Sequence, residues 1–89
     1  MQKIDHQPQS WYLFEHGADL FLDCNCNVSA FGYSVLIRLT PEEAAEYRTV
    51  GRTYLSWLAD QVQSTGPGGD YQKRDVQREY SDELAAAFR

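Results

Sequence analysis

Hydrophobic and polar residues alternate along three segments in the first half of the chain, which is the pattern of half-buried β-strands. The first segment is rich in aromatic residues, which favour strands, and the other two alternate cleanly. Short polar stretches separate the segments, and one of them contains Gly17, which is able to adopt the positive φ angle of a tight turn. We therefore expect a three-stranded antiparallel β-meander. Its strands should be residues 10–15, 20–26 and 31–39, joined by turns at 16–19 and 27–30.

The alternation also divides this sheet into two faces. If the loop 27–30 joins antiparallel strands, Cys26 pairs with Phe31 and Leu22 with Val35, so one face collects a continuous apolar set. We call this the inner face, and we expect it to pack against a helix. Its predicted members are Trp11, Leu13, Leu20, Leu22, Cys24, Cys26, Phe31, Tyr33, Val35, Ile37 and Leu39.

The segment Thr40-Pro41-Glu42-Glu43 predicts the start of a helix. The Thr40 hydroxyl can cap free backbone N–H groups, Pro41 suits the first helical position, and the Glu43 carboxylate can complete a capping box. We expect a long amphipathic helix from here to about residue 63, with Gly51 in close contact with a strand. Its apolar stripe comprises Ala44, Tyr47, Gly51, Tyr54, Leu55, Leu58 and Val62.

The two ends of the chain are more polar. Residues 1–9 are predicted to form a flexible leader, and the glycine-rich residues 64–70 a flexible loop. A short helix should begin at Ser81, which is a good N-cap residue. An alternative starts this helix near Lys73, which would align apolar side chains at every fourth position. Those side chains are Val76, Tyr80, Leu84 and Phe88.

Together these elements predict an α+β fold. It consists of a three-stranded antiparallel β-meander, then a long amphipathic helix packed on one face, then a short C-terminal helix. The chain has 89 residues, which is enough for one domain and too few for two. We place that single domain at residues 10–89.

Cys24 and Cys26 are the first candidates for chemistry, because two thiols at alternate positions of a strand point the same way. They could share a soft metal or form a redox pair, with His16 as a third group. Tetrahedral zinc requires more ligands than this neighbourhood supplies, and the chain has only two cysteines and two histidines. We favour structural, metal-free cysteines and predict no cofactor. The alternative is a small enzyme or metal or redox protein that uses Cys24, Cys26 and His16.

The charge balance narrows the choice of partner. Thirteen acidic residues against eight basic ones give a net charge of -5, which repels a phosphate backbone, so we expect no nucleic-acid binding. An acidic protein can be steered toward a basic partner. No apolar run approaches the ~20 residues that span a bilayer, and the N-terminus lacks a signal-peptide pattern. We therefore expect a cytoplasmic protein that does not bind membranes and has reduced cysteines.

The second face of the sheet, which we call the outer face, carries more large apolar side chains than a solvated face should. Two covers are possible. The first is the C-terminal segment with Tyr80, Leu84 and Phe88, folded over this face. The second is a partner protein bound there, either another protein or a second copy in a homodimer. We expect a non-catalytic protein-binding or self-associating domain. The predicted partner-binding residues are Tyr12, Phe14, Phe21, Leu36 and Arg38, with Asp19, Asp23 and Ser34 between them.

Overall fold

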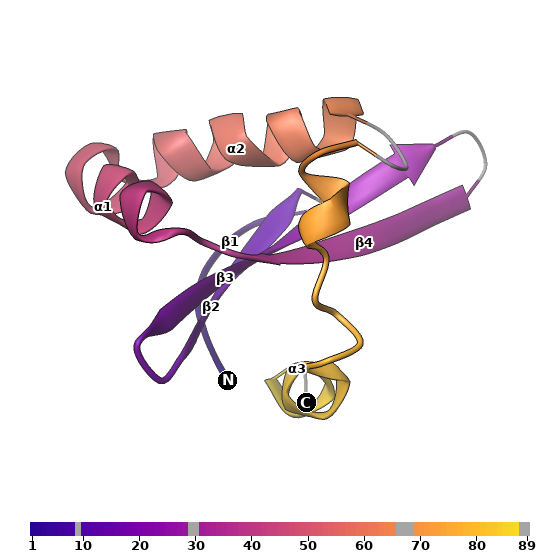
Figure 1. Ribbon diagram of the computed structural model, residues 1–89, viewed down its shortest axis with the longest axis horizontal. Coiled ribbons are helices and arrows are strands. Elements are labelled where there is room, and N and C mark those ends of the chain that lie inside the picture. The colour runs from indigo at the N-terminus through magenta and orange to yellow at the C-terminus, as the bar shows by residue number, and fades with distance from the viewer. Residues whose placement is uncertain (9, 29–30, 66–68, 88–89) are drawn as a thin grey trace.

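The computed structural model describes residues 1–8, 10–28, 31–65 and 69–87 of the chain. It is an α+β fold in which a four-stranded antiparallel sheet lies between helices on its two sides (Figure 1). The strands follow one another across the sheet in chain order. The elements are β1 (Gln2–Gln7), β2 (Trp11–His16), β3 (Asp19–Val28), β4 (Phe31–Arg38), α1 (Pro41–Val50), α2 (Arg52–Thr65), the 3-10 turn η1 (Gln72–Arg74) and α3 (Ser81–Ala87).

The sheet has four strands and not the predicted three, because most of the expected leader 1–9 forms β1. This edge strand pairs antiparallel with β2 and bulges at Ile4, where the pairing register shifts. Arg52 of α2 holds it by donating a hydrogen bond to the His6 carbonyl oxygen at 2.7 Å. Nearly every residue of β1 is exposed, so the strand has no apolar face that alternation could reveal.

The pairing of β3 with β4 is displaced by two residues from the prediction. Cys24 faces Val35 and Leu22 faces Ile37, and β3 continues to Val28. Because side chains alternate with a period of two, a displacement of two residues leaves each of them on its predicted face. The predicted turn 27–30 therefore begins too early, and its residues 29–30 lie outside the described part of the chain. Gly17 has the expected positive φ angle, 62°.

The inner face carries the main hydrophobic core. Helix α2 lies along it and buries four side chains against the strands. The fully buried Trp11 places its indole N–H 3.2 Å from the Ser56 hydroxyl of α2, so its one polar group is paired. The prediction for the Phe31 side chain lies outside the described part of the chain. The core comprises Trp11, Leu13, Leu20, Leu22, Cys24, Cys26, Val35, Ile37, Leu39, Leu55, Leu58, Ala59 and Val62.

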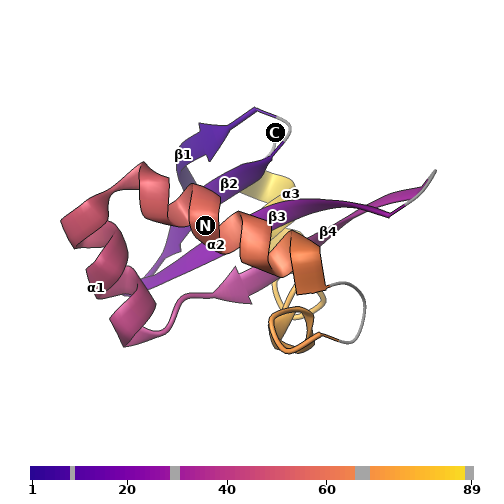
Figure 2. The ribbon, with the colours of Figure 1, turned by 90° about the horizontal axis from the view of Figure 1, so that it is seen from above.

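The expected long helix is interrupted at Gly51, which separates α1 from α2 (Figure 2). Gly51 has a φ angle of 91°, which a residue with a side chain adopts only under strain. Its N–H donates to the Tyr47 carbonyl at 2.7 Å, and this bond closes α1. A Cβ atom at this position would meet nothing within 4 Å, so the predicted close contact with a strand is wrong. Gly51 instead provides the change of direction between the two helices.

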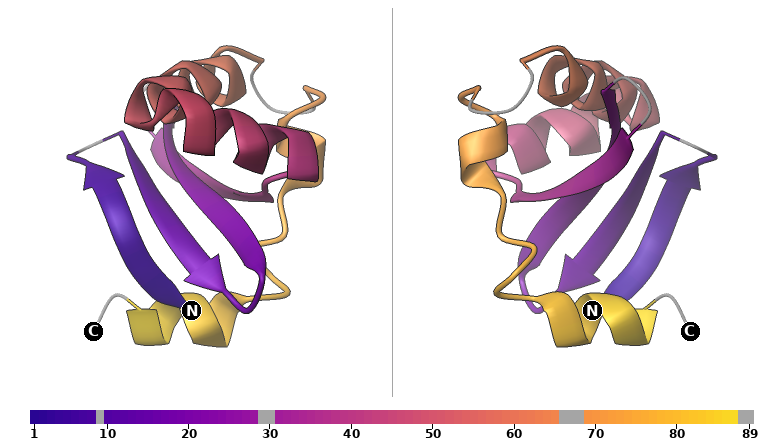
Figure 3. Two further views of the ribbon diagram at one scale, coloured as in Figure 1. Left: turned by 90° about the vertical axis from the view of Figure 1, so that its left-hand side faces the viewer. Right: turned by 90° about the vertical axis from the view of Figure 1, so that its right-hand side faces the viewer.

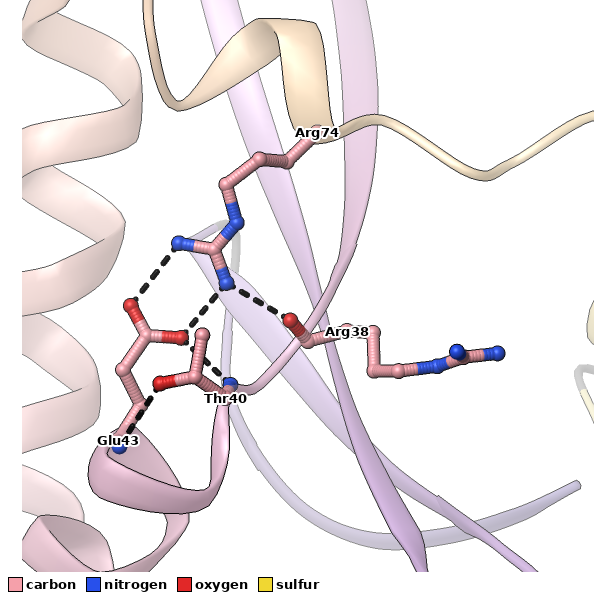
Figure 4. Close-up of polar contacts among 4 residues, drawn as sticks. All are labelled: Arg38, Thr40, Glu43 and Arg74. Carbon is pink, nitrogen blue, oxygen red and sulfur yellow. Dashed lines mark hydrogen bonds and ion pairs between the residues drawn. The ribbon is translucent and has the colours of Figure 1, made fainter.

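The predicted capping box is confirmed at the start of α1 (Figure 4). The Thr40 hydroxyl accepts from the Glu43 N–H at 3.1 Å, and the Thr40 N–H donates to the Glu43 carboxylate at 2.9 Å. The same carboxylate receives both guanidinium Nη atoms of Arg74, at 2.6 and 2.9 Å. Burial alone would raise the pKa of Glu43, but the hydrogen bonds from Arg74 and Thr40 lower it overall.

Arg74 also ties this junction to the sheet. Its guanidinium donates to the Arg38 carbonyl oxygen, the last of β4, at 2.7 Å, while the Arg38 side chain points away from the junction (Figure 4). One side chain thus joins η1, the end of β4 and the start of α1. The chain that follows η1 therefore leaves from a fixed point beside β4.

Candidate functional site

The outer face of the sheet is covered by the C-terminal segment, one of the two covers that the sequence left open. Helix α3 lies across this face, on the side opposite α1 and α2 (Figure 3). Leu84, which is 6% exposed, packs with side chains of the sheet in a second hydrophobic cluster. We call residues 76–87 the C-terminal cover. The cluster contains Phe14, Phe21, Leu36 and Leu84, with Val76, Tyr80, Ala87, Met1 and Tyr12 partly buried around them.

Three of the five predicted partner-binding side chains are therefore core residues in this conformation. Phe14, Phe21 and Leu36 are 0% exposed, so in this conformation the C-terminal segment covers them. Tyr12 is partly buried and Arg38 is exposed. That this face binds a partner stays a prediction.

Arg38 holds the cover in place. Its guanidinium lies over the rings of Phe21 and Tyr80, with 5.4 and 5.8 Å to their centroids, and it donates a hydrogen bond to the Tyr80 hydroxyl. The Asp19 carboxylate lies 3.8 Å from the Arg38 Nε atom. The cationic end of Arg38 is thus engaged within the chain, by the first residues of the cover.

The cover begins on the free edge of β4. Asp75 forms an antiparallel bridge with Ile37. Its carboxylate accepts the Leu36 N–H at 3.0 Å, and the Val76 N–H donates to the Leu36 carbonyl at 2.8 Å. The Asp75 carboxylate also accepts the Gln77 N–H at 3.0 Å. These bonds satisfy backbone groups that an edge strand leaves open, and they fix where the cover departs.

Asp23 is the least satisfied group beneath the cover. It lies on the outer face between Tyr12 of β2 and Leu36 of β4. The residue is only 7% exposed, and its Oδ1 atom has no hydrogen-bond partner among the described residues. Burial, and then the negative charge of Asp75, raise its pKa to about 6. At neutral pH the protein therefore holds an unpaired, largely buried carboxylate, which is an unfavourable arrangement.

Two hollows on the outer face meet at Asp23, each with a volume of about 270 Å³. Asp23 and Ser34 line both of them. One hollow lies on the uncovered part of the face, and the other lies between the sheet and the cover and is open to solvent at Ser81 and Ala85. The first is completed by Ser10, Tyr12 and Asn25, and the second by Gln77, Ser81, Leu84 and Ala85. We take Asp23 with these hollows as the candidate site.

The residues of the alternative chemistry do not come together. Cys24 and Cys26 are free thiols buried in the inner core. Burial is the largest cause that raises both of their pKa values, which disfavours the reactive thiolate. The His16 ring instead packs against Phe21 and Tyr80 of the outer cluster, at centroid distances of 6.4 and 5.8 Å. The sheet separates His16 from the thiols, and within the described ranges no three potential metal ligands gather.

A larger hollow of about 500 Å³ lies where the strands meet α1, and three arginines line it. Two of their guanidinium groups already have anionic or hydroxyl partners. Arg74 is paired with Glu43, and Arg38 is bonded to Tyr80. The third is Arg48, on α1. We interpret this hollow as a junction between elements, since the guanidinium groups of Arg38 and Arg74 already bind partners within the chain.

The sequence had indicated part of this site. Alternation placed Asp23 on the outer face among large apolar side chains, but its burial follows from the path of the cover, which local pattern does not specify.

No protein-family model, curated protein or solved structure matches the chain. Across the described residues, no helix has the length and apolar character needed to cross a membrane. The fold and the site define an α+β sheet domain whose outer face is occupied by its own C-terminal segment.

Proposed function

We propose that this protein is a non-catalytic protein-binding domain, and that its binding surface is the outer face of the sheet. In the unbound protein the C-terminal cover occupies this surface, and a partner displaces the cover. A second copy of the chain is one such partner, because it carries the same segment and can exchange covers about a two-fold axis.

The observation that carries this proposal is the thinness of the cover. Helix α3 has seven residues, and Leu84 is its one buried side chain, whereas α2 buries four side chains on the inner face. An isolated helix of this length is unstable in water, so α3 depends on its contacts with the sheet. Its detachment leaves the inner core untouched.

The surface beneath the cover suits a protein partner. Phe14, Phe21 and Leu36 form an apolar centre, and burial of each contributes about 1.5–3 kcal/mol relative to exposure. Polar residues of the two hollows border this centre. An apolar centre with a polar rim is the usual anatomy of a protein interface.

A peptide exchange experiment tests the proposal. The chain truncated after Asp75 should retain the circular dichroism signal of the sheet and of α1 and α2, losing only the contribution of α3, and should bind a synthetic peptide of residues 76–89. Full-length protein should bind this peptide much more weakly, because its own cover competes. A peptide with Leu84→Asp serves as the control and should not bind. If the truncated chain loses its fold, the cover is an integral part of the domain and the proposal is wrong.

A further inference from the structure

The chain's own cover fits the outer face imperfectly at Asp23. The hollow of about 270 Å³ between α3 and the sheet is open to solvent and is lined on the sheet side by Asp23 and Ser34. On the cover side it is lined by Gln77, Leu84 and two small residues, Ser81 and Ala85. These two are four positions apart, so they lie on the same side of the helix. Neither side chain is long enough to fill the hollow.

The electrostatics of the hollow point to a missing cation. Asp23 is an acid with an unpartnered Oδ1 atom and little contact with water. The nearby charged group that acts on Asp23 is Asp75, at the start of the C-terminal segment. Because Asp75 is also a carboxylate, it repels the charge of Asp23. None of the residues from the cover that line the hollow carries a positive charge. A buried carboxylate is stabilised by a positively charged partner that also donates hydrogen bonds.

We propose that the partner's segment is an amphipathic helix with a lysine or arginine where α3 presents Ser81 or Ala85, and that this side chain pairs with Asp23. The inference rests on the proposed function, since it names the chemistry of the partner that displaces the cover. The partner's apolar side chains replace Leu84 over Phe14, Phe21 and Leu36. Its basic side chain enters the hollow that α3 leaves empty.

This arrangement explains how a partner prevails over a cover that belongs to the same chain. Both make apolar contacts with the outer cluster, but only the partner neutralises Asp23. The difference between the two occupants is thus a single charged contact, which gives specificity for a basic helix. The net charge of -5 attracts such a partner from a distance.

The full-length chain allows a direct test, because a cation can be placed on the cover itself. We expect Ala85→Lys or Ser81→Lys to raise the urea midpoint at pH 8 and to lower the pKa of Asp23, followed by NMR, by about 1–3 units. The matched control is Ala86→Lys, which adds the same charge to the same helix at an exposed neighbouring position outside the hollow. A second control adds Ala85→Lys to an Asp23→Asn chain, where the gain should vanish.

The proposal is overturned if neither lysine in the hollow exceeds Ala86→Lys, or if the gain survives in the Asp23→Asn chain. A binding arm separates this failure from failure of the proposed function. Peptides of residues 76–89 with Ala85→Lys or Ala86→Lys are added to the full-length protein, and NMR shifts at Leu36 and Val76 report displacement of the cover. We expect the Ala85→Lys peptide to bind at least about tenfold more tightly. Equal binding of the two refutes the Asp23 contact alone, whereas binding of neither refutes the displaceable cover and the partner with it.

Discussion

The two faces of the sheet are built on different scales. Thirteen of the described residues form the inner core, under a helix of fourteen residues. Four form the outer cluster, under a helix of seven. Polar groups on the inner side find partners, as when the Gln63 amide donates to the Asn25 carbonyl at 2.7 Å. On the outer side the Asp23 carboxylate is left with an unpaired oxygen.

This difference supports the proposal that the inner face stabilises the fold while the outer face binds a partner. Hydrophobic stabilisation grows with the apolar area removed from water, so most of it comes from the inner face. The outer face contributes less, and opening there does not require the sheet to unfold. Regions with few buried apolar contacts are those that open by local fluctuation. We therefore expect the inner face to act as the scaffold and the outer face to exchange its contacts.

The largest test compares the same substitution on the two faces. Leu58→Ala, in the inner core, should lower the free energy of unfolding by about 2–5 kcal/mol. Leu84→Ala, in the cover, should lower the free energy of global unfolding by less than Leu58→Ala does, because the loss cannot exceed the free energy of closing the cover, about 2.7 kcal/mol for a cover closed about 99% of the time. It should also accelerate hydrogen exchange in α3, because the cover opens first. Urea titration and amide exchange measure both effects. Equal losses of global stability would show that the two faces unfold as one unit.

The second test removes the unpaired charge. The pKa of Asp23 is raised from 3.8 to about 6 in the folded protein. The folded state therefore has its full stability when Asp23 is protonated, below pH 3.8, and loses stability as the pH rises through 6 and the buried carboxyl must ionise. At about 1.4 kcal/mol per pH unit, Asp23→Asn should raise the free energy of unfolding by up to about 3 kcal/mol at pH 8. Little change is expected near pH 4. The exposed Asp60→Asn is the control, and a gain independent of pH would argue against a buried carboxylate.

The smallest effect is expected at the helix cap on the inner side. Thr40→Ala removes the hydroxyl that accepts from the Glu43 N–H, and should lower the free energy of unfolding by about 1 kcal/mol. Hydrogen exchange in α3 should not change, since Thr40 belongs to the other helical layer. Faster exchange in α3 alone would mean that the junction at Arg74 transmits the loss to the cover.

Sequence pattern predicted the features that depend on local chemistry. Alternation assigned the described side chains of the sheet to its two faces correctly even where the register was displaced by two residues, and Thr40 and Ser81 marked true helix starts. The hydrophobic pattern did not predict features that depend on contacts between residues far apart in the sequence. The strand β1 is exposed and polar, so only its pairing with β2 reveals it.

Gly51 and Asp23 show the same limit in two ways. The apolar stripe predicts close packing at Gly51, but this position instead requires a glycine because its φ angle is positive. Sequence pattern does not reveal that backbone angle. Asp23 was placed on the correct face, but its burial arises from residues more than fifty positions further along the chain. The prediction for Phe88 as part of the cover falls outside the described residues.

The bonds that fix Arg74 to the start of α1 and Asp75 to the edge of β4 affect how a partner competes with the cover. A released α3 remains attached by the few residues between Asp75 and Ser81. A short tether of this kind presents its segment at an effective concentration in the millimolar range. A partner helix therefore competes with a tethered cover whose effective concentration does not fall when the protein is diluted. If the cover is closed about 99% of the time, the apparent affinity of the partner helix falls about a hundredfold below its intrinsic value. Lengthening the tether should relax this penalty without altering a single contact on the sheet.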